Sequence, residues 1–376
     1  MKRICLISQT VTPGFSIFRR EFISFLVSKG YIVYALATDY TPHNEQLVRS
    51  LGAIPVPYRL NKTGTNILVD IYHLLLLYTT VLKLSPDVVF SFFVKPSIYG
   101  SIAAAIARVP RIVAMLEGLG YVHTEAKKGR QVTKFFLRCI HGFLCSLSYF
   151  FVDKLILLNS NDADDLCRFA YVNKKKVRIL GPIGVDLESY PNAPMNFNVP
   201  IRFIFIARLL VNKGVHEFIA AARMVKSQFT DVEFVILGAL DNTNPASISV
   251  EEFETLIKDD LVIYPGHVDD VIDWITDSHV FVLPSYREGF PRSTQEAMAI
   301  GRAIITTDVP GCRETVVDGV NGFIVPPRNS VSLADKMIWL VHNPQEIERM
   351  GCESHRMALE RFDVHKINPA FAGIVV

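Results

Sequence analysis

The sequence predicts an α/β protein with two doubly wound domains, each built on a parallel sheet that carries helices on both faces. Short runs rich in Val, Ile, Leu and Phe alternate with longer, helix-like stretches along the chain. This alternation stops once, between residues 182 and 200, and then starts again. The chain has 376 residues, 50% of them hydrophobic, which is enough for two buried cores and excludes global disorder.

The first half of the chain contains five apolar runs that predict strands. They span residues 4–7, 32–37, 88–92, 112–115 and 155–158. The helices predicted between them span residues 15–29, 66–84, 96–108 and 128–150. Continuous apolar strands joined by helices are typical of parallel sheets, so residues 1–182 are predicted to form one domain.

The second half repeats this pattern and predicts a second domain, residues 183–376. Its six predicted strands span residues 203–207, 233–237, 261–264, 280–283, 303–306 and 323–325. The Pro- and Asn-rich segment 182–200 is the predicted join. The last predicted helix, residues 345–362, either completes this domain or crosses back to the first. Ligands of open α/β sheets bind beyond the carboxyl ends of the strands, so we expect the site in a cleft between the domains.

Charge is divided unequally between the two halves. Residues 1–182 contain 23 Lys and Arg against 11 Asp and Glu, whereas residues 183–376 contain 16 against 26. A basic half predicts an anionic partner, usually a membrane surface or a nucleic acid. We expect no nucleic acid, because the sequence has neither a known reading motif nor aromatic residues interleaved with the basic ones on a predicted sheet.

The cysteines and the apolar stretches indicate a cytoplasmic protein without a membrane span. The six cysteines have no metal-site spacing, which is typical of free thiols in a reducing compartment. The first apolar run is too short for a signal peptide. The two longest apolar stretches, residues 67–82 and 135–152, are interrupted by charged or polar residues and fall short of a span.

Basic residues at the start of the second of these stretches predict contact with an anionic membrane. They are Lys127, Lys128, Arg130, Lys134 and Arg138. A helix with this basic end fits the headgroup zone of a bilayer, and its aromatic residues would add apolar contact. Those aromatic residues are Phe135, Phe136, Phe143, Tyr149, Phe150 and Phe151. The alternative is a core helix with a solvated basic end.

The segment LPSYREGFPRSTQEAMAIG, residues 283–301, carries two glutamates in a strand–loop–helix context. Glu288 lies in the loop, and a helix is predicted to begin near Phe290, so that Glu296 falls inside it. Free backbone N–H groups at a helix start, here those of Gly289 and Phe290, favour anionic or hydroxyl-rich ligands. The alternative is a helix cap followed by a solvated glutamate.

The segment FIARLLVNKGVHEF, residues 205–218, places two cations after a strand. Arg208 and Lys213 lie in the predicted loop, and Gly214 opens the next helix. Two cations at the carboxyl end of a strand and beside a helix start suit a diphosphate. The alternative is a pair of surface cations.

Together these segments resemble the retaining glycosyltransferases of family 4, which have the two-domain GT-B fold. The resemblance covers nearly the whole chain: the E-x7-E spacing, the Arg/Lys segment and the stretch TTDVPGCRETVVDGVNGFIVPP, residues 306–327. The segments AMLEGLGYV, residues 114–122, and SYREGFPRS look like bacterial transferases that act on undecaprenyl-diphosphate-linked sugars. Among these the α-1,3-N-acetylgalactosaminyltransferases are the nearest type.

The resemblance implies roles on the donor side. Arg208 and Lys213 would neutralise the leaving diphosphate, Glu288 would bind donor-sugar hydroxyls, and all three are the expected catalytic residues. Glu296 would bind the ribose hydroxyls. The donor-binding set is completed by backbone groups of Gly289 and Phe290 and by Gly14, which lies in QTVTPGF where many members have a Gly-Gly pair.

On the acceptor side the resemblance points to Glu117, Gly118 and Gly120. Glu117 stands where many relatives place a His before the glycine, and it would bind or orient the acceptor hydroxyl. No separate base is expected, because the departing phosphate oxygen is well placed to take the acceptor proton. The donor would be a UDP-sugar and the acceptor a polyprenyl-diphosphate-linked saccharide of O-antigen, capsule or glycan assembly. The protein would sit peripherally on the inner face of the cell membrane.

We expect no metal or other cofactor. The sequence Asp162-Ala163-Asp164 has the spacing of a metal-binding D-x-D, but it opens a predicted helix, where acidic residues are ordinary caps. The rival functions are a nucleotide-sugar 2-epimerase of similar fold and a non-catalytic membrane-binding module. The epimerase needs no basic face, and the module does not explain the two glutamates and two cations together.

Overall fold

The computed structural model describes residues 1–61, 67–119, 131–241, 246–258 and 260–376. The chain forms two compact units. Unit 1 consists of Met1–Ile183 together with His365–Val376, and unit 2 consists of Gly184–Val364. The unit boundary therefore lies one residue later than predicted. The last twelve residues, predicted as part of the second domain, belong to unit 1.

Unit 1 is built on a seven-stranded parallel sheet in the order β3-β2-β1-β4-β5-β6-β7. The strands are β1 (Arg3–Ile7), β2 (Ile32–Ala37), β3 (Ile54–Pro57), β4 (Val88–Phe92), β5 (Arg111–Leu116), β6 (Lys154–Leu157) and β7 (Val177–Ile179). The five predicted strands are present within one or two residues. The two edge strands, β3 and β7, were not predicted: they are short, and β3 contains two prolines, which sheets tolerate at an edge.

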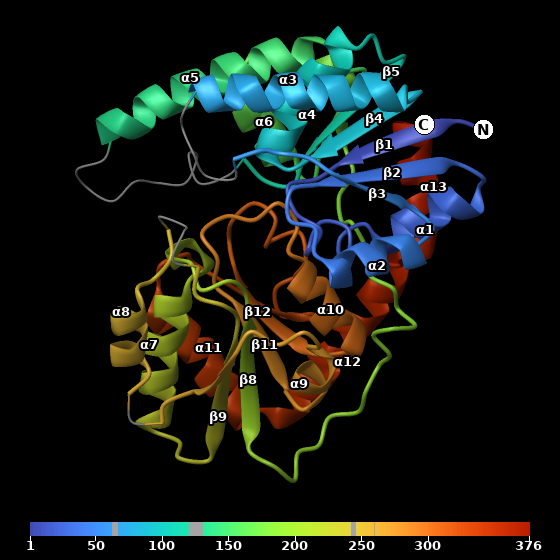
Figure 1. Cartoon of the computed structure of the whole chain (residues 1–376). Helices are drawn as coiled ribbons and strands as arrows, with labels where there is room; N and C mark the ends of the chain where they lie inside the picture. Colours follow the sequence, from blue (N-terminus) through green and yellow to red (C-terminus); the bar gives the residue numbers. More distant parts are fainter. Residues whose placement is uncertain (62–66, 120–130, 242–245, 259) are drawn as a thin grey trace. The chain divides into compact units, whose positions relative to one another are not determined.

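Helices cover both faces of this sheet (Figure 1). They are α1 (Arg20–Ser28), α2 (Pro42–Ser50), α3 (Ile67–Leu84), α4 (Val94–Ile106), α5 (Gln131–Phe150) and α6 (Ser160–Phe169). The third to sixth lie on one face, and the first two lie on the other. α4 is rich in Ala, Ser and Gly and mostly buried, so it packs closely against β4 and β5 and contacts α3 and α5.

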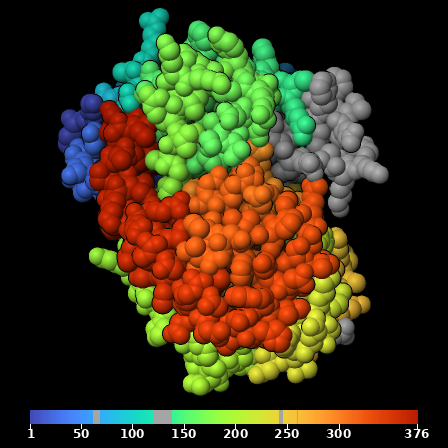
Figure 2. Space-filling view, turned by 180° about the vertical axis from the view of Figure 1, so that it is seen from behind, coloured from blue at the N-terminus to red at the C-terminus, as the bar shows by residue number. Residues whose placement is uncertain are grey.

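A C-terminal helix that the sequence analysis did not predict completes unit 1. The predicted last helix is α12 (Pro344–Arg361), which stays in unit 2, and a further helix, α13 (Val364–Val375), follows it. α13 contains Pro369, which argues against a helix when only the sequence is read. The ring of Phe371 packs on Phe22 at 4.4 Å between centroids, and the red C-terminal residues border the blue N-terminal ones in Figure 2.

Unit 2 is built on a six-stranded parallel sheet in the order β10-β9-β8-β11-β12-β13. The strands are β8 (Ile201–Ile206), β9 (Val232–Leu237), β10 (Ile263–Gly266), β11 (Val280–Leu283), β12 (Ala303–Thr307) and β13 (Gly322–Val325). All six were predicted, although β10 lies two residues later than expected. Helices again lie on both faces (Figure 1). With α12 they are α7 (Val215–Lys226), α8 (Val250–Leu256), α9 (Ile272–Thr276), α10 (Arg292–Ile300) and α11 (Ser330–His342).

The strand order reverses once in each sheet, and this is the position at which doubly wound folds bind ligands. In unit 1 the reversal lies between β1 and β4, and in unit 2 it lies between β8 and β11. The loops that leave two such neighbouring strands diverge to opposite faces and leave a crevice at the carboxyl edge. The Arg208–Lys213 segment follows β8 and the Glu288 segment follows β11, so both predicted motifs of unit 2 lie at its reversal point.

Candidate functional site

The loops after β8 and β11 are held together by backbone contacts. The first loop ends in a short 3-10 turn, Val211–Lys213, and Gly214 then adopts a left-handed conformation with φ of +78°. A Cβ atom on Gly214 would overlap the carbonyl oxygen of Pro284 in the second loop. The Tyr286 N–H donates to the Asn212 carbonyl at 2.9 Å. Only glycine allows this approach, and the approach carries Lys213 toward the second loop.

Lys213 and Glu288 form the centre of the candidate site. The Lys213 Nζ donates to Glu288 Oε1 at 2.5 Å, and the Ser285 hydroxyl donates to the same oxygen at 2.7 Å. Both charged side chains are largely buried, with 19% and 10% of their surfaces exposed. The cation and the carboxylate that the sequence analysis treated as separate features are therefore one unit.

A third loop supports Glu288 from behind. The Glu288 N–H donates to the Pro310 carbonyl at 3.0 Å. A side chain at Gly311, where φ is +84°, would collide with the Glu288 carbonyl oxygen. The neighbouring Cys312 thiol is completely buried, and this burial raises its pKa to about 12. The thiol is therefore neutral at physiological pH and adds no charge beside the Lys213–Glu288 pair.

Arg208 and Glu296 differ in their surroundings. Arg208 is exposed after β8, and within the described part of the chain its side chain has no hydrogen-bond or ion-pair partner. Glu296 is buried inside α10, where its Oε1 accepts from the Arg292 Nε at 2.9 Å and from the Tyr190 hydroxyl at 3.1 Å. Burial, together with the neighbouring Glu296 carboxylate, raises the pKa of the Tyr190 hydroxyl.

The start of α10 lies close to the predicted position. The helix begins at Arg292, two residues after Phe290, with Pro291 before it. Gly289 and Phe290 therefore belong to the loop that precedes the helix. The Phe290 side chain is buried in a T-shaped contact with Phe362 at 5.8 Å, so only its backbone is placed to meet a ligand.

Several site residues were missed by the sequence analysis. Ser285 and Arg292 contact the two glutamates of the motif directly, and Tyr190 reaches Glu296 from far along the chain. Arg292 was detectable, because it precedes Glu296 by four residues on one helix, a spacing that brings opposite charges together. Nothing in the sequence pattern marks Tyr190.

In unit 1, Gly14 lies in the loop after β1 and packs against its own chain. A Cβ atom there would overlap the Ser8 hydroxyl and the Thr10 carbonyl oxygen. Glycine is thus required at this position by contacts within the loop. A role in approaching a donor phosphate stays a prediction.

The predicted acceptor residues follow β5. The Glu117 carboxylate is mostly buried and accepts from the Arg19 guanidinium, with Oε1 at 2.5 Å from Nη2. Gly118 has a φ of +152°, which favours glycine. Gly120 lies outside the described residues.

The predicted membrane residues are only partly described. Lys127, Lys128 and Arg130 lie outside the described residues, and Lys134 lies on α5 in a stretch whose side chains are not described. Arg138 is exposed. Of the aromatic residues with described side chains, Phe143, Phe150 and Phe151 are exposed.

Tyr149 corrects the predicted set of membrane-facing aromatic residues. It is 1% exposed, and its hydroxyl hydrogen-bonds the Ser97 hydroxyl of α4 at 2.9 Å. It belongs to the core because it lies on the face of α5 that packs against α4.

The D-x-D sequence has the local structure of a helix cap. Asn159 precedes α6, and its side-chain oxygen accepts from the Asp162 N–H at 2.7 Å, while its amide donates to the Asp162 carboxylate at 3.2 Å. In the described part of the chain no three His, Cys, Asp or Glu residues gather as a metal site would require. Nor does any described helix combine the length and apolar character needed to cross a bilayer.

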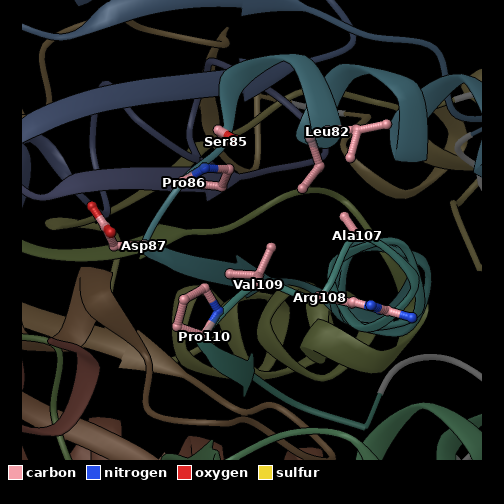
Figure 3. A pocket seen from close by; sticks show the side chains of 9 residues that line it. Leu82, Ser85, Pro86, Asp87, Ala107, Arg108, Val109 and Pro110 are labelled. Carbon is pink, nitrogen blue, oxygen red and sulfur yellow. The ribbon is translucent and has the colours of Figure 1, made fainter.

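A cavity of about 250 Å³ lies elsewhere in unit 1 (Figure 3). It is lined by the end of α3, the end of α4 and the residues that follow each helix, among them Ser85, Pro86, Asp87, Arg108 and Pro110. These residues immediately precede β4 and β5, so the cavity lies at the amino edge of the sheet, opposite the edge where doubly wound folds bind ligands.

Comparison with known protein families identifies the class of this protein. A family model described as "Glycosyl transferases group 1" matches residues 200–343, which contain the whole sheet of unit 2. A second, described as "Glycosyl transferase 4-like", matches residues 3–157, which contain six strands of unit 1. The chain therefore belongs to the group 1 glycosyltransferases, family 4, a family of retaining, UDP-sugar-dependent enzymes with the GT-B fold.

Two curated relatives act on lipid-linked sugars according to their names. The N,N'-diacetylbacillosaminyl-diphospho-undecaprenol alpha-1,3-N-acetylgalactosaminyltransferase of Campylobacter jejuni is 28% identical over 341 residues, covering 87% of this chain and 86% of the relative. The UDP-Gal:alpha-D-GlcNAc-diphosphoundecaprenol alpha-1,3-galactosyltransferase of Escherichia coli is 27% identical, covering 81% of this chain and 79% of the relative.

Solved structures share the fold over the full length. Sucrose-phosphate synthase from Thermosynechococcus elongatus matches with a TM-score of 0.81 at 17% identity, covering 100% of this chain and 98% of the other. Anabaena HepE in complex with UDP-glucose matches with a TM-score of 0.80 at 19% identity, covering 99% of both chains. At these identities the likeness establishes the fold alone.

Proposed function

We propose that this protein transfers a sugar, with retention of anomeric configuration, from a UDP-sugar to a saccharide linked to undecaprenyl diphosphate. The particular transfer we propose is of GalNAc through an α-1,3 linkage, during assembly of a bacterial surface polysaccharide (O-antigen or capsule) or glycan. The observation that carries the proposal is the Lys213–Glu288 pair at the strand-order reversal of unit 2. The names of the two relatives support the lipid-linked acceptor.

In the proposed reaction the bond between the anomeric carbon and the leaving UDP breaks, and negative charge grows on the diphosphate. Arg208, which is exposed and not paired in the described structure, and Lys213 stabilise that charge. Glu288 accepts from hydroxyls of the donor sugar. Because Lys213 already donates to Glu288, a single ammonium links the sugar-binding carboxylate to the leaving group.

The remaining predicted residues bind the substrates. Glu296 accepts from the ribose hydroxyls, and backbone groups of Gly289, Phe290 and Gly14 line the donor. Glu117, Gly118 and Gly120 belong to the acceptor side. The acceptor proton passes to the departing phosphate oxygen, so the reaction needs neither a separate base nor a metal, and EDTA is expected to leave the rate unchanged.

We also propose that the helices α3 and α5 of unit 1 dock on the cytoplasmic face of an anionic membrane. Exposed apolar residues recur at helical spacing on both: Leu68, Ile71, Tyr72, Leu75 and Leu82 on α3, and Ile140, Phe143, Leu147 and Phe150 on α5. α5 contains no acidic residue, and the single one of α3, Asp70, is buried and paired with Lys95 at 3.1 Å. A face with apolar side chains and no exposed carboxylate suits an anionic bilayer.

Basic residues beside α5 add to this surface. Lys174 and Lys175 are exposed, and the half-buried Lys176 donates from its Nζ to the Phe150 carbonyl at 2.8 Å at the end of α5. Each such cation near an anionic surface contributes about 1 kcal/mol to binding. They join Arg138 and the predicted cluster Lys127, Lys128, Arg130 and Lys134.

A donor panel tests the proposed reaction. UDP-GalNAc, UDP-GlcNAc, UDP-Gal, UDP-Glc and GDP-mannose are each incubated with a short polyprenyl-diphosphate sugar, and the products are analysed by mass spectrometry and NMR. We expect transfer from UDP-GalNAc with an α linkage. Transfer from another donor would correct the sugar, and a β linkage would contradict retention.

The same panel without an acceptor examines the alternative, a nucleotide-sugar 2-epimerase. Isomerisation of a UDP-sugar in the absence of any lipid-linked saccharide would replace transferase by isomerase as the function. Slow release of UDP and free sugar would instead agree with a transferase that uses water in place of its acceptor.

A further inference from the structure

Arg19 and Arg302 are the largest fully buried side chains of the described structure, and Arg19 has 1% of its surface exposed. It lies immediately before α1, and aromatic rings surround its guanidinium. The guanidinium carbon is 4.9 Å from the ring centre of Phe92 and 6.0 Å from that of Phe90, both on β4, and 5.5 Å from that of Phe371 on α13. Such rings attract a cation but cannot replace the hydrogen bonds it loses on burial.

A carboxylate at the ligand-binding edge of the sheet supplies such a hydrogen bond. Arg19 Nη2 lies 2.5 Å from Glu117 Oε1, and Nη1 donates to the Phe18 carbonyl at 2.7 Å. Glu117 directly follows β5, the neighbour of β4, and its side chain is 11% exposed. Arg19 therefore connects this carboxylate to α13, which approaches from the other end of the chain.

A buried ion pair of this kind is a poor way to stabilise a core. Apolar residues of similar volume at both positions are often as stabilising or more so, whereas removal of one partner leaves a buried charge. The aromatic surroundings of Arg19 would accommodate an apolar side chain. The charge at this position thus indicates a role at Glu117 in addition to any role in folding.

We propose that Arg19 is a positioning residue, which holds the Glu117 carboxylate in the orientation that accepts a hydrogen bond from the acceptor sugar, with Phe371 fixing the guanidinium. This inference rests on the proposed transfer reaction and deepens it. Loss of one hydrogen bond to a charged group lowers affinity about tenfold or more. The acceptor KM should therefore rise in Arg19 variants, whereas the donor KM should not.

The test uses Arg19→Met, Glu117→Gln and the double variant in the full-length protein. Acceptor KM, donor KM, kcat, UDP binding and Tm are measured for each, with the polyprenyl-diphosphate sugar as acceptor. We expect both single variants to raise the acceptor KM at least about tenfold and to lower Tm, with donor KM and UDP binding within about twofold. The double variant should recover Tm, because no unpaired charge is left, but should keep the high acceptor KM.

Recovery of both Tm and acceptor KM in the double variant would show that the pair is only structural. If the acceptor KM of the double variant equals that of the unchanged protein, the pair is likewise only structural. This result can be read even if Arg19→Met alone fails to fold. Arg19→Lys, which retains the charge, should lie between the unchanged protein and Arg19→Met in acceptor KM. If the unchanged protein transfers no sugar to any acceptor, the proposed function is wrong, and this inference, which rests on it, is wrong as well.

Discussion

At the scale of single residues, the candidate donor site depends on one close ion pair. The Lys213 and Glu288 side chains are 19% and 10% exposed, so both are largely buried, and each comes from a different loop. An ion pair in such a place responds strongly to a diphosphate, because little water screens the added charge. The Lys213 side chain is thus the most direct test of the site.

Replacing Lys213 by Met should lower kcat by about 10²–10³, because a preorganised group that stabilises leaving-group charge is lost. Glu288→Gln should mainly weaken binding of the donor sugar, since its Lys213 contact loses charge. Steady-state kinetics with the active donor and UDP titration calorimetry measure both effects. Lys258→Met, an exposed lysine of unit 2, is the matched control and should change neither quantity. A Lys213→Met enzyme within threefold of normal kcat would refute the role of this ammonium.

Gly214 offers a second test at the residue scale, directed at the loop geometry. In Gly214→Ala the left-handed backbone conformation is strained by about 1–2 kcal/mol, and the new methyl group also overlaps the Pro284 carbonyl. Gly319→Ala is the control, because Gly319 has a similar φ of +75° and, in the described structure, an added Cβ meets no atom within 4 Å.

The free energy of unfolding, measured with denaturant, should therefore fall further in Gly214→Ala than in Gly319→Ala, by roughly 1–3 kcal/mol. Activity should fall in Gly214→Ala alone, because Lys213 shifts with the loop. Equal losses of stability in the two variants would mean that the loops after β8 and β11 do not meet as described.

At the scale of helices, α3 and α5 each carry apolar residues on two faces. Hydropathy alone does not show which of these residues pack in the core and which are exposed. Both helices bury one face over α4, and both also expose apolar residues on the opposite face, such as Leu68 (78% exposed) and Phe143 (67% exposed). An exposed apolar face on a helix whose other face is already buried indicates a second contact surface, such as a membrane.

Replacing Leu68 and Leu75 of α3 by Ser should lower binding to vesicles that contain anionic lipid by at least about tenfold. Each exposed leucine that enters the interface contributes roughly 1.5 kcal/mol or more. Vesicle flotation measures the bound fraction, and raised salt should weaken the remaining, cation-dependent part. The matched control replaces Val317 and Val331, which are exposed apolar residues of unit 2. Unchanged flotation of the α3 variant would remove α3 from the docking surface.

At the scale of the whole molecule, the two units differ in how the chain builds them. Unit 2 is one continuous segment, whereas unit 1 needs residues from both ends of the chain. Arg111 of β5 donates to the carbonyl oxygens of Ile374 and Val375, and Phe371 packs on Phe22 and Phe90. The first unit is therefore complete only after the last residues have been synthesised.

Phe371→Ala should destabilise unit 1 by about 3–5 kcal/mol, the usual loss for a buried phenylalanine, and leave unit 2 unchanged. Amide hydrogen exchange of the full-length protein reports on the two units separately. Protection should fall in β1 and β4 of unit 1 but not in β8 and β11 of unit 2. Phe253→Ala, which removes a buried ring of unit 2, should give the opposite pattern. Equal loss of protection in both units after either change would show that they unfold together.

The two parallel sheets, eleven of their thirteen described strands and the two motif loops of unit 2 could all be predicted from the sequence alone. These features depend on local patterns: continuous apolar runs, and charged residues just beyond them. The short edge strand β3 and the helix α13 were not predicted, because each contains proline, a residue that argues against a strand or a helix when only local sequence is read.

Which side chains meet could not be predicted and follows from the tertiary fold. The pairing of Lys213 with Glu288, the contact of Tyr190 with Glu296 and the burial of Arg19 beside Glu117 join residues between 75 and 106 positions apart. Local sequence carries no signal for such contacts, since they arise from strand order and from the close approach of loops at glycines. The return of α13 to unit 1 has the same origin: the apolar surface that covers Phe371 comes from residues at the other end of the chain.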